Sequence, residues 1–158
     1  MIKKPTWIAG TLVGAAITVL ALSGVKLSIA EMWPAYFLVL LYMLRGLTNP
    51  KDLKDIYCGG VVGILWSYCV VLFISMLTPI IGSFSALGIV CFFSIFLLIV
   101  LNDVQPMLFN NYAFIYYLVA ALYPEQKSVQ WILTLLVGGT AFALMVIGGL
   151  AVLLKQRR

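Results

Sequence analysis

Long apolar runs, separated by short polar or basic segments, make up most of the chain. A helix needs about 20 apolar residues to cross the roughly 30 Å hydrocarbon core of a membrane. The pattern therefore predicts an all-α membrane protein with six transmembrane helices, named spans 1 to 6 in chain order: 7–25, 33–47, 56–77, 80–101, 106–123 and 129–154. Spans 2 and 5 are the short ones, because the uninterrupted apolar part of span 5 starts only at Tyr112.

Composition supports a membrane protein and excludes a soluble domain. Hydrophobic residues make up 64% of the chain, charged residues 9%, and the mean hydropathy is +1.13, whereas soluble domains are about 45–50% apolar and about 25% charged. A chain of 158 residues has room for one domain and excludes a sizeable soluble catalytic domain. We expect a single transmembrane domain over residues 1–158, with halves of about 1–78 and 79–158, and the lipid bilayer as its surroundings.

The positive charges predict the topology. With six spans, eight of the ten Lys and Arg residues fall on one side of the membrane. Because cytoplasmic loops are enriched in Lys and Arg, we expect a multi-pass membrane protein with both termini in the cytoplasm. The basic residues flank apolar spans and form no soluble basic face, so nucleic acid is not an expected partner. The cytoplasmic set is Lys3, Lys4, Arg45, Lys51, Lys54, Lys155, Arg157 and Arg158, and Lys26 and Lys127 lie opposite.

No catalytic or metal-binding pattern is visible. The chain has no His, and its three cysteines, Cys58, Cys69 and Cys91, lie inside apolar runs without metal-site or disulfide spacing. No phosphate-binding loop occurs. The five acids lie near the ends of spans, so a proton relay inside the membrane is poorly supported. We therefore expect neither an enzyme, nor a metal site, nor a cofactor.

The two halves of the sequence contain a weak internal match. Tyr36-Phe37-Leu38-Val39 in span 2 is similar to Tyr116-Tyr117-Leu118-Val119 in span 5, and Gly59-Gly60 is similar to Gly138-Gly139. Three spans per half is an odd number, so the halves would insert in opposite orientations, as in the 3+3 inverted repeats of many transporters. The alternative is chance similarity within a small apolar alphabet.

The densest polar cluster among the apolar runs lies at 101–117. We expect Asn102 and Asp103 to form a cytoplasmic polar mouth, and Asn110 and Asn111 to lie deeper, beyond the helix-breaking Pro106. An amide both donates and accepts hydrogen bonds, which suits a small polar solute. Two alternatives are a cytoplasmic turn with Asp103 among the headgroups, and hydrogen bonds between helices.

Aromatic residues and glycines give two further predictions. Tyr36, Trp66, Tyr112 and Tyr116 lie away from the span ends and are candidates to line the solute pathway, with simple core packing as the alternative. Glycines let helices approach closely, which predicts tight helix packing and a homo-oligomer. The glycines assigned to packing are Gly59, Gly60, Gly63, Gly138 and Gly139.

With these motifs in place, the chain resembles a family of small bacterial inner-membrane proteins of unknown function. The resemblance covers most of the chain and rests on four features. These are Trp33-Pro34 at the start of span 2, the run Gly59-Gly60-x-x-Gly63-x-x-Trp66, the aromatic segment after Pro106, and the glycine-rich last helix. It implies a six-helix solute channel or exporter in the bacterial inner membrane, and it carries over no substrate and no site residue.

The function expected from these features is a channel or facilitator for a small polar or weakly charged solute. We expect the pathway to run between spans 2 and 5. Spans this short imply non-helical backbone at membrane depth, which is tolerated only where it is buried in protein or lines a water-filled cavity. The absence of buried acids and of His favours passive flow over proton coupling. The alternatives are a secondary transporter with alternating access and a membrane scaffold subunit that transports nothing.

Overall fold

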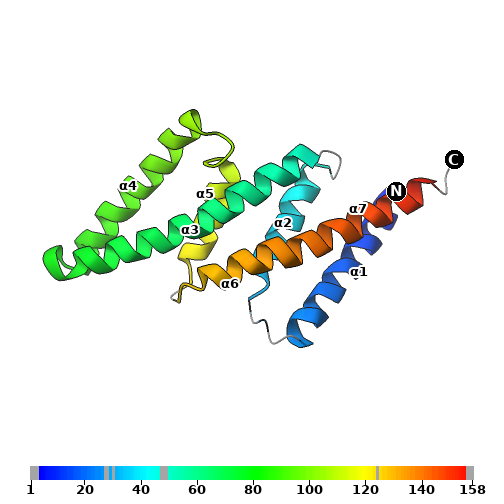
Figure 1. Ribbon diagram of the computed structural model, residues 1–158, viewed down its shortest axis with the longest axis horizontal. Coiled ribbons are helices and arrows are strands. Elements are labelled where there is room, and N and C mark those ends of the chain that lie inside the picture. The colour runs from blue at the N-terminus through cyan, green and yellow to red at the C-terminus, as the bar shows by residue number, and fades with distance from the viewer. Residues whose placement is uncertain (1–3, 27–28, 30, 47–49, 124, 156–158) are drawn as a thin grey trace. The chain divides into compact units, whose positions relative to one another are not determined.

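The computed structural model describes residues 4–26, 29, 31–46, 50–123 and 125–155, and their regular structure is entirely helical (Figure 1). Each predicted apolar segment corresponds to one helix or one continuous helical run, so the all-α prediction is confirmed for this part of the chain. The elements are α1 (Lys4–Lys26), α2 (Trp33–Leu44), α3 (Pro50–Ile81), α4 (Ser83–Val104), α5 (Asn111–Ala121), α6 (Ser128–Leu133), the π-helix η1 (Thr134–Gly138) and α7 (Gly139–Lys155).

Helix length separates the apolar elements into two groups. Three segments are long and apolar enough to cross a membrane: Lys51–Ile81, Ser83–Val104 and Ser128–Gly149. Val13–Lys26, Trp33–Leu44 and Asn111–Ala121 are apolar but shorter. Among these, α5 has 11 residues, which corresponds to about 16 Å of helix. The structure thus provides three candidate spans, and a total of six crossings stays a prediction.

Two prolines help to explain where helices begin and end. The polar segment between predicted spans 2 and 3 is helical from Pro50 onward, because proline is favoured in the first turn and Asp52 complements the positive helix terminus. Residues 48 and 49 lie outside the described part. The predicted break at Pro106 is confirmed: α4 ends at Val104, and Gln105, which precedes the proline, leaves the helical region at φ −137° and ψ 71°.

The residues group into two compact units, each described by itself. The first unit comprises Met1–Thr48 and Leu133–Arg158, and the second comprises Asn49–Ile132. Each unit therefore combines elements from both predicted halves, 1–78 and 79–158. The division falls inside the helical run that begins with α6 and continues through η1 into α7.

In the second unit, α4 and α5 both pack on α3. The short helix α5 lies against the glycine-containing part of α3, because a Cβ atom added to Gly63 would lie 2.9 Å from the Cβ of Tyr116. Such a contact is shorter than real Cβ atoms show, so only glycine allows this approach. Beyond it, α3 and α4 form a hairpin around a core of Val70, Val90, Leu98 and Tyr117.

In the first unit, α1 and α2 pack on α7, and α2 also contacts η1. Gly138, at the end of η1, faces α2, where an added Cβ would lie 3.3 Å from the Cβ of Ala35. The buried core of this unit consists of Val13, Ala16, Leu20, Ala35, Val39, Phe142 and Val146. Both units thus place a short helix against a glycine of a long helical run.

Candidate functional site

A small cavity lined by three asparagines and four apolar residues lies in the second unit, where the end of α4 meets the start of α5. Its volume is about 210 Å³. The structure brings three sequence-predicted residues together here, Asn102, Asn110 and Asn111, and no charged side chain is among the residues that line it. The lining consists of Leu98, Ile99, Asn102, Phe109, Asn110, Asn111 and Phe114.

Asn110 is the N-cap of α5, and its amide is fully used inside the protein. The Oδ1 atom accepts hydrogen bonds from the backbone N–H groups of Tyr112 and Ala113, at 3.0 and 3.1 Å. The Nδ2 atom donates to the carbonyl oxygens of Met107 and Asp55, at 3.0 and 2.9 Å. A primary amide has two donor hydrogens and an acceptor oxygen with two lone pairs. Asn110 therefore has no hydrogen-bonding capacity left for a solute, and its role here is structural.

Asn102 and Asn111 differ from Asn110 in this respect. Asn102 is half-buried near the end of α4, and Asn111 is exposed in the first turn of α5. Neither side chain is hydrogen-bonded to the part of the protein that the structure describes. Asp103, which was predicted to share the mouth with Asn102, is exposed and does not line the cavity. The two amides are therefore the groups that can bind a polar molecule in this cavity.

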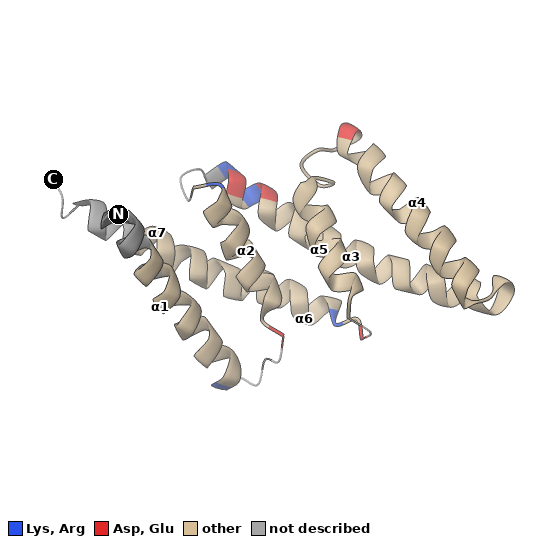
Figure 2. Ribbon diagram, turned by 180° about the vertical axis from the view of Figure 1, so that it is seen from behind, with Lys and Arg blue, Asp and Glu red and all other residues tan. Residues whose placement is uncertain are grey.

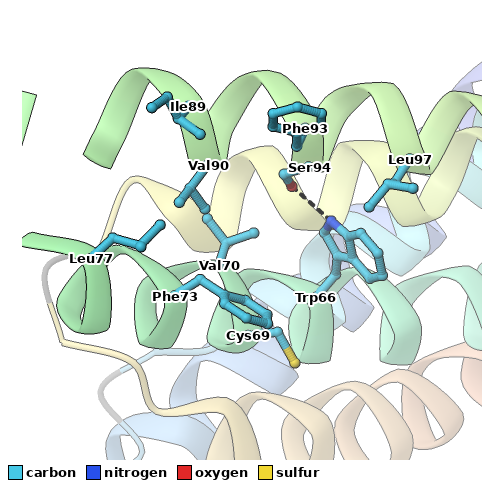
Figure 3. Close-up of a pocket in the computed structure, with 10 residues that line it drawn as sticks. All are labelled: Trp66, Cys69, Val70, Phe73, Leu77, Ile89, Val90, Phe93, Ser94 and Leu97. Atoms are coloured by element: carbon cyan, nitrogen blue, oxygen red, sulfur yellow. Dashed lines mark hydrogen bonds between the residues drawn. The ribbon is translucent and has the colours of Figure 1, made fainter. Parts of the chain in front are cut away.

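Trp66 lies beside this cavity and connects α3 to α4. Its ring packs edge-on against Phe109, with ring centroids 5.8 Å apart. Its Nε1–H donates a hydrogen bond of 2.7 Å to the hydroxyl of Ser94 in α4 (Figure 3). Ser94 was not predicted as a functional residue. The sequence contained one indication that Ser94 has a partner, because a hydroxyl in a long apolar run needs a hydrogen-bond partner within the hydrocarbon.

The same Trp66 forms one wall of an apolar cavity between α3 and α4, with a volume of about 390 Å³ (Figure 3). Val70 and Phe73 line it from α3, and Val90 and Phe93 line it from α4. The hydrogen bond between Trp66 and Ser94 joins two residues of this lining across α3 and α4. Trp66 therefore lines the apolar cavity and contacts Phe109, which lines the asparagine cavity.

The tyrosines predicted to line a pathway are packed into helix contacts. Tyr116 is fully buried and packs over Gly63, and Tyr112 is also buried. Neither residue lines the asparagine cavity. Tyr36 belongs to the first unit, where it packs against that unit's core. Their assignment to a solute pathway stays a prediction.

The predicted packing glycines occupy comparable places in the two units. An added Cβ on Gly59 would meet the side chain of Asn110, which caps α5, and would lie 2.8 Å from the backbone nitrogen of Ala113. An added Cβ on Gly138 would lie 3.8 Å from the methyl group of Met32, which caps α2, and would also contact Ala35. Gly60 and Gly139 are buried as well.

Gln126, another residue that the sequence reasoning missed, holds the turn between α5 and α6 on α3. Its Nε2 atom donates to the carbonyl oxygens of Ala120 and Tyr123, both at 3.1 Å. Its Oε1 atom accepts a 3.2 Å hydrogen bond from the buried hydroxyl of Ser67 in the middle of α3. Glutamine is common in loops, so sequence position alone gives no indication of this contact.

Comparisons with known proteins gave no match to the chain. No protein-family model matches it, and no curated protein or solved structure is significantly similar to it. The resemblance to small bacterial inner-membrane proteins therefore stays a prediction. Among the residues that the structure describes, no three His, Cys, Asp or Glu side chains are grouped to hold a metal ion.

Proposed function

We propose that this chain is a membrane channel or facilitator for a small, uncharged polar solute that contacts Asn102 and Asn111. The observation that carries the proposal is the asparagine cavity, in which two amides make no hydrogen bond to the described part of the protein and no charged group is part of the lining. An amide pair binds a neutral molecule through both donors and acceptors. An ion would find no opposite charge there to replace its hydration.

The distribution of charge supports passive flow. In the second unit, the charged side chains lie near the ends of elements, and the middle of α3 and the whole of α5 carry none (Figure 2). They are Lys51, Asp52, Lys54 and Asp55 at the start of α3, Asp103 at the end of α4, and Glu125 and Lys127 between α5 and α6. Between Asp55 and Asp103 the sequence has no charged residue. Coupling to protons requires a titratable group along the path, and the asparagine cavity supplies none.

The repeated helix packing favours a second candidate, a secondary transporter built on an inverted repeat. The short helix α5 of the second half packs on α3 of the first, and the short helix α2 of the first half packs on η1 and α7 of the second. If the two helix starts are aligned, so that Met32 corresponds to Asn110 and Ala35 to Ala113, then Leu38 corresponds to Tyr116. The sequence match had instead paired Tyr36 with Tyr116. Paired short helices of this kind are typical of transporter solute sites.

The proposal is tested by osmotic shrink–swell recovery of liposomes that contain the purified protein. We expect faster recovery than in empty liposomes for small neutral solutes that hydrogen-bond, such as urea or glycerol. With salts of similar size, liposomes that contain the protein should recover no faster than empty liposomes. Equal recovery with and without protein for every solute would refute a passive pathway.

The two candidates differ in their dependence on ion gradients. A channel conducts its solute at the same initial rate whether or not a proton or sodium gradient is imposed. A secondary transporter accumulates its solute against a concentration difference when the coupling ion flows. Accumulation of solute in liposomes with an imposed ion gradient would therefore replace the first candidate with the second.

A further inference from the structure

A second polar cavity, independent of the proposed transport site, lies where α3 meets the turn before α6. Its volume is about 510 Å³. Its lining mixes polar and apolar side chains and includes a charged one, Lys127, which neither cavity described above contains. The residues that line it are Leu65, Tyr68, Gln126, Lys127, Ser128, Val129, Gln130 and Ile132.

The polar part of this cavity is held in place by the protein. Gln126 makes three hydrogen bonds, two to carbonyl oxygens at the end of α5 and one to Ser67 of α3. These bonds position the adjacent Lys127 and Ser128 without using either of their side chains. A group bound at Lys127 and Ser128 would therefore meet a largely preformed site, which lowers the entropic cost of binding.

Two polar groups in the cavity favour an anionic ligand. The Lys127 side chain is 40% exposed and lies 3.8 Å from the carboxylate of Glu125, which is 83% exposed. An ion pair this exposed contributes little to stability, so a stronger anion can displace it. Ser128 is only 8% exposed, and its hydroxyl has no hydrogen-bond partner in the described part of the chain. A buried hydroxyl without a partner is costly, and a ligand oxygen would satisfy it.

The apolar part of the cavity favours a ligand with a hydrocarbon tail. Leu65, Val129 and Ile132 line it, and Val129 is 75% exposed. The same cavity includes Lys127, which pairs with Glu125, so it passes from an apolar wall to charged groups. A membrane interface has the same sequence of environments, from hydrocarbon to charged headgroups.

We propose that this cavity binds an anionic phospholipid. The phosphate diester accepts hydrogen bonds from the Lys127 ammonium and the Ser128 hydroxyl, and an acyl chain covers Leu65, Val129 and Ile132. Free phosphate shares the chemistry of the headgroup but lacks the tail, so it would use only the polar part of the site. The lipid is preferred because the apolar wall and the basic group occur in the same cavity.

The test measures lipid binding to the purified full chain in detergent, by native mass spectrometry and by the shift in thermal unfolding. We expect phosphatidylglycerol to bind and to raise the unfolding temperature more than phosphatidylcholine does. Lys127→Gln should weaken phosphatidylglycerol binding about fivefold, the order expected for one basic residue at a lipid surface. Lys127→Arg should retain binding, and Lys54→Gln, which removes a cation at the other end of the unit, should leave it unchanged.

A second variant keeps the test decisive if Lys127→Gln does not fold. Glu125→Gln removes the carboxylate that competes for Lys127, so it should strengthen phosphatidylglycerol binding. The proposal is overturned if Glu125→Gln weakens binding or leaves it unchanged, or if Lys127→Gln and Lys54→Gln have equal effects. Equal stabilisation by inorganic phosphate alone would also overturn it, because the tail would then contribute nothing.

Discussion

Gly59 of α3 lies directly against the side chain of Asn110, the residue that caps α5. An added Cβ at Gly59 would overlap the Asn110 Oδ1 atom, which accepts two backbone hydrogen bonds at the start of the helix. Gly59 therefore contributes both to the approach of α5 to α3 and to the space in which Asn110 caps α5. This contact positions Asn111, the next residue along, at the polar cavity.

Gly59→Ala should destabilise the protein by about 1–3 kcal/mol, the usual range for an overpacked contact. The added methyl group would have to displace either the Asn110 amide or the backbone of Ala113. Thermal or denaturant unfolding in detergent measures the loss. The matched control is Gly88→Ala in α4, where an added Cβ meets nothing within 4 Å. Equal stability of the two variants would contradict the packing.

Asn110→Leu should lose about 1–2 kcal/mol of stability, because it removes a helix cap and its bond to the Asp55 carbonyl. Asn111→Leu should leave unfolding unchanged, since that side chain makes no hydrogen bond to the described protein. The same unfolding experiment compares the two variants. Equal losses would show that Asn111 also has a structural role.

The hydrogen bond between Trp66 and Ser94 should couple the stabilities of α3 and α4. A double-mutant cycle with Trp66→Phe and Ser94→Ala removes the donor, the acceptor or both. We expect a coupling energy of about 0.6 kcal/mol, the mean for hydrogen bonds between membrane helices. Ser85→Ala, at an exposed position of α4, should show no coupling to Trp66→Phe. A coupling energy of zero between Trp66→Phe and Ser94→Ala would mean that this hydrogen bond contributes nothing to stability.

The charge pattern predicts that Lys54 and Lys127 lie on opposite sides of the membrane. Single cysteines at these positions, in a background without Cys58, Cys69 and Cys91, should react with a membrane-impermeant maleimide from opposite sides. Lys54→Cys should be labelled only after the membrane is opened, and Lys127→Cys should be labelled in intact cells. Labelling of both positions from one side would refute the topology.

The sequence predicted the helices well because each one is an apolar run bounded by polar residues or proline. It could not predict the π-helix at Thr134–Gly138, because a local change in backbone hydrogen bonding leaves no trace in an apolar pattern. Residue type also failed to separate Asn110 from Asn111. Both are amides at the same break in hydropathy, and only the chain direction makes one of them the cap.

The partners of Ser67 and Trp66 lay beyond sequence reasoning for a different reason. Ser67 bonds to Gln126, and Trp66 bonds to Ser94, so each pair joins residues far apart in the chain. A single sequence gives no information on which distant polar residues meet. The hydroxyls in apolar runs indicated that partners were needed, but the fold was required to identify them.

The most direct test of the proposed function is the flux of a neutral solute through the Asn102→Leu/Asn111→Leu double variant. The assay is shrink–swell recovery of liposomes that contain equal amounts of each protein. The controls are the wild-type protein and Gln105→Leu, which removes a nearby amide that does not line the cavity. We predict that the double variant loses most of the solute flux while Gln105→Leu retains it, with all three proteins equally stable. Unchanged flux in a folded double variant would contradict the assignment of the asparagine cavity to the pathway.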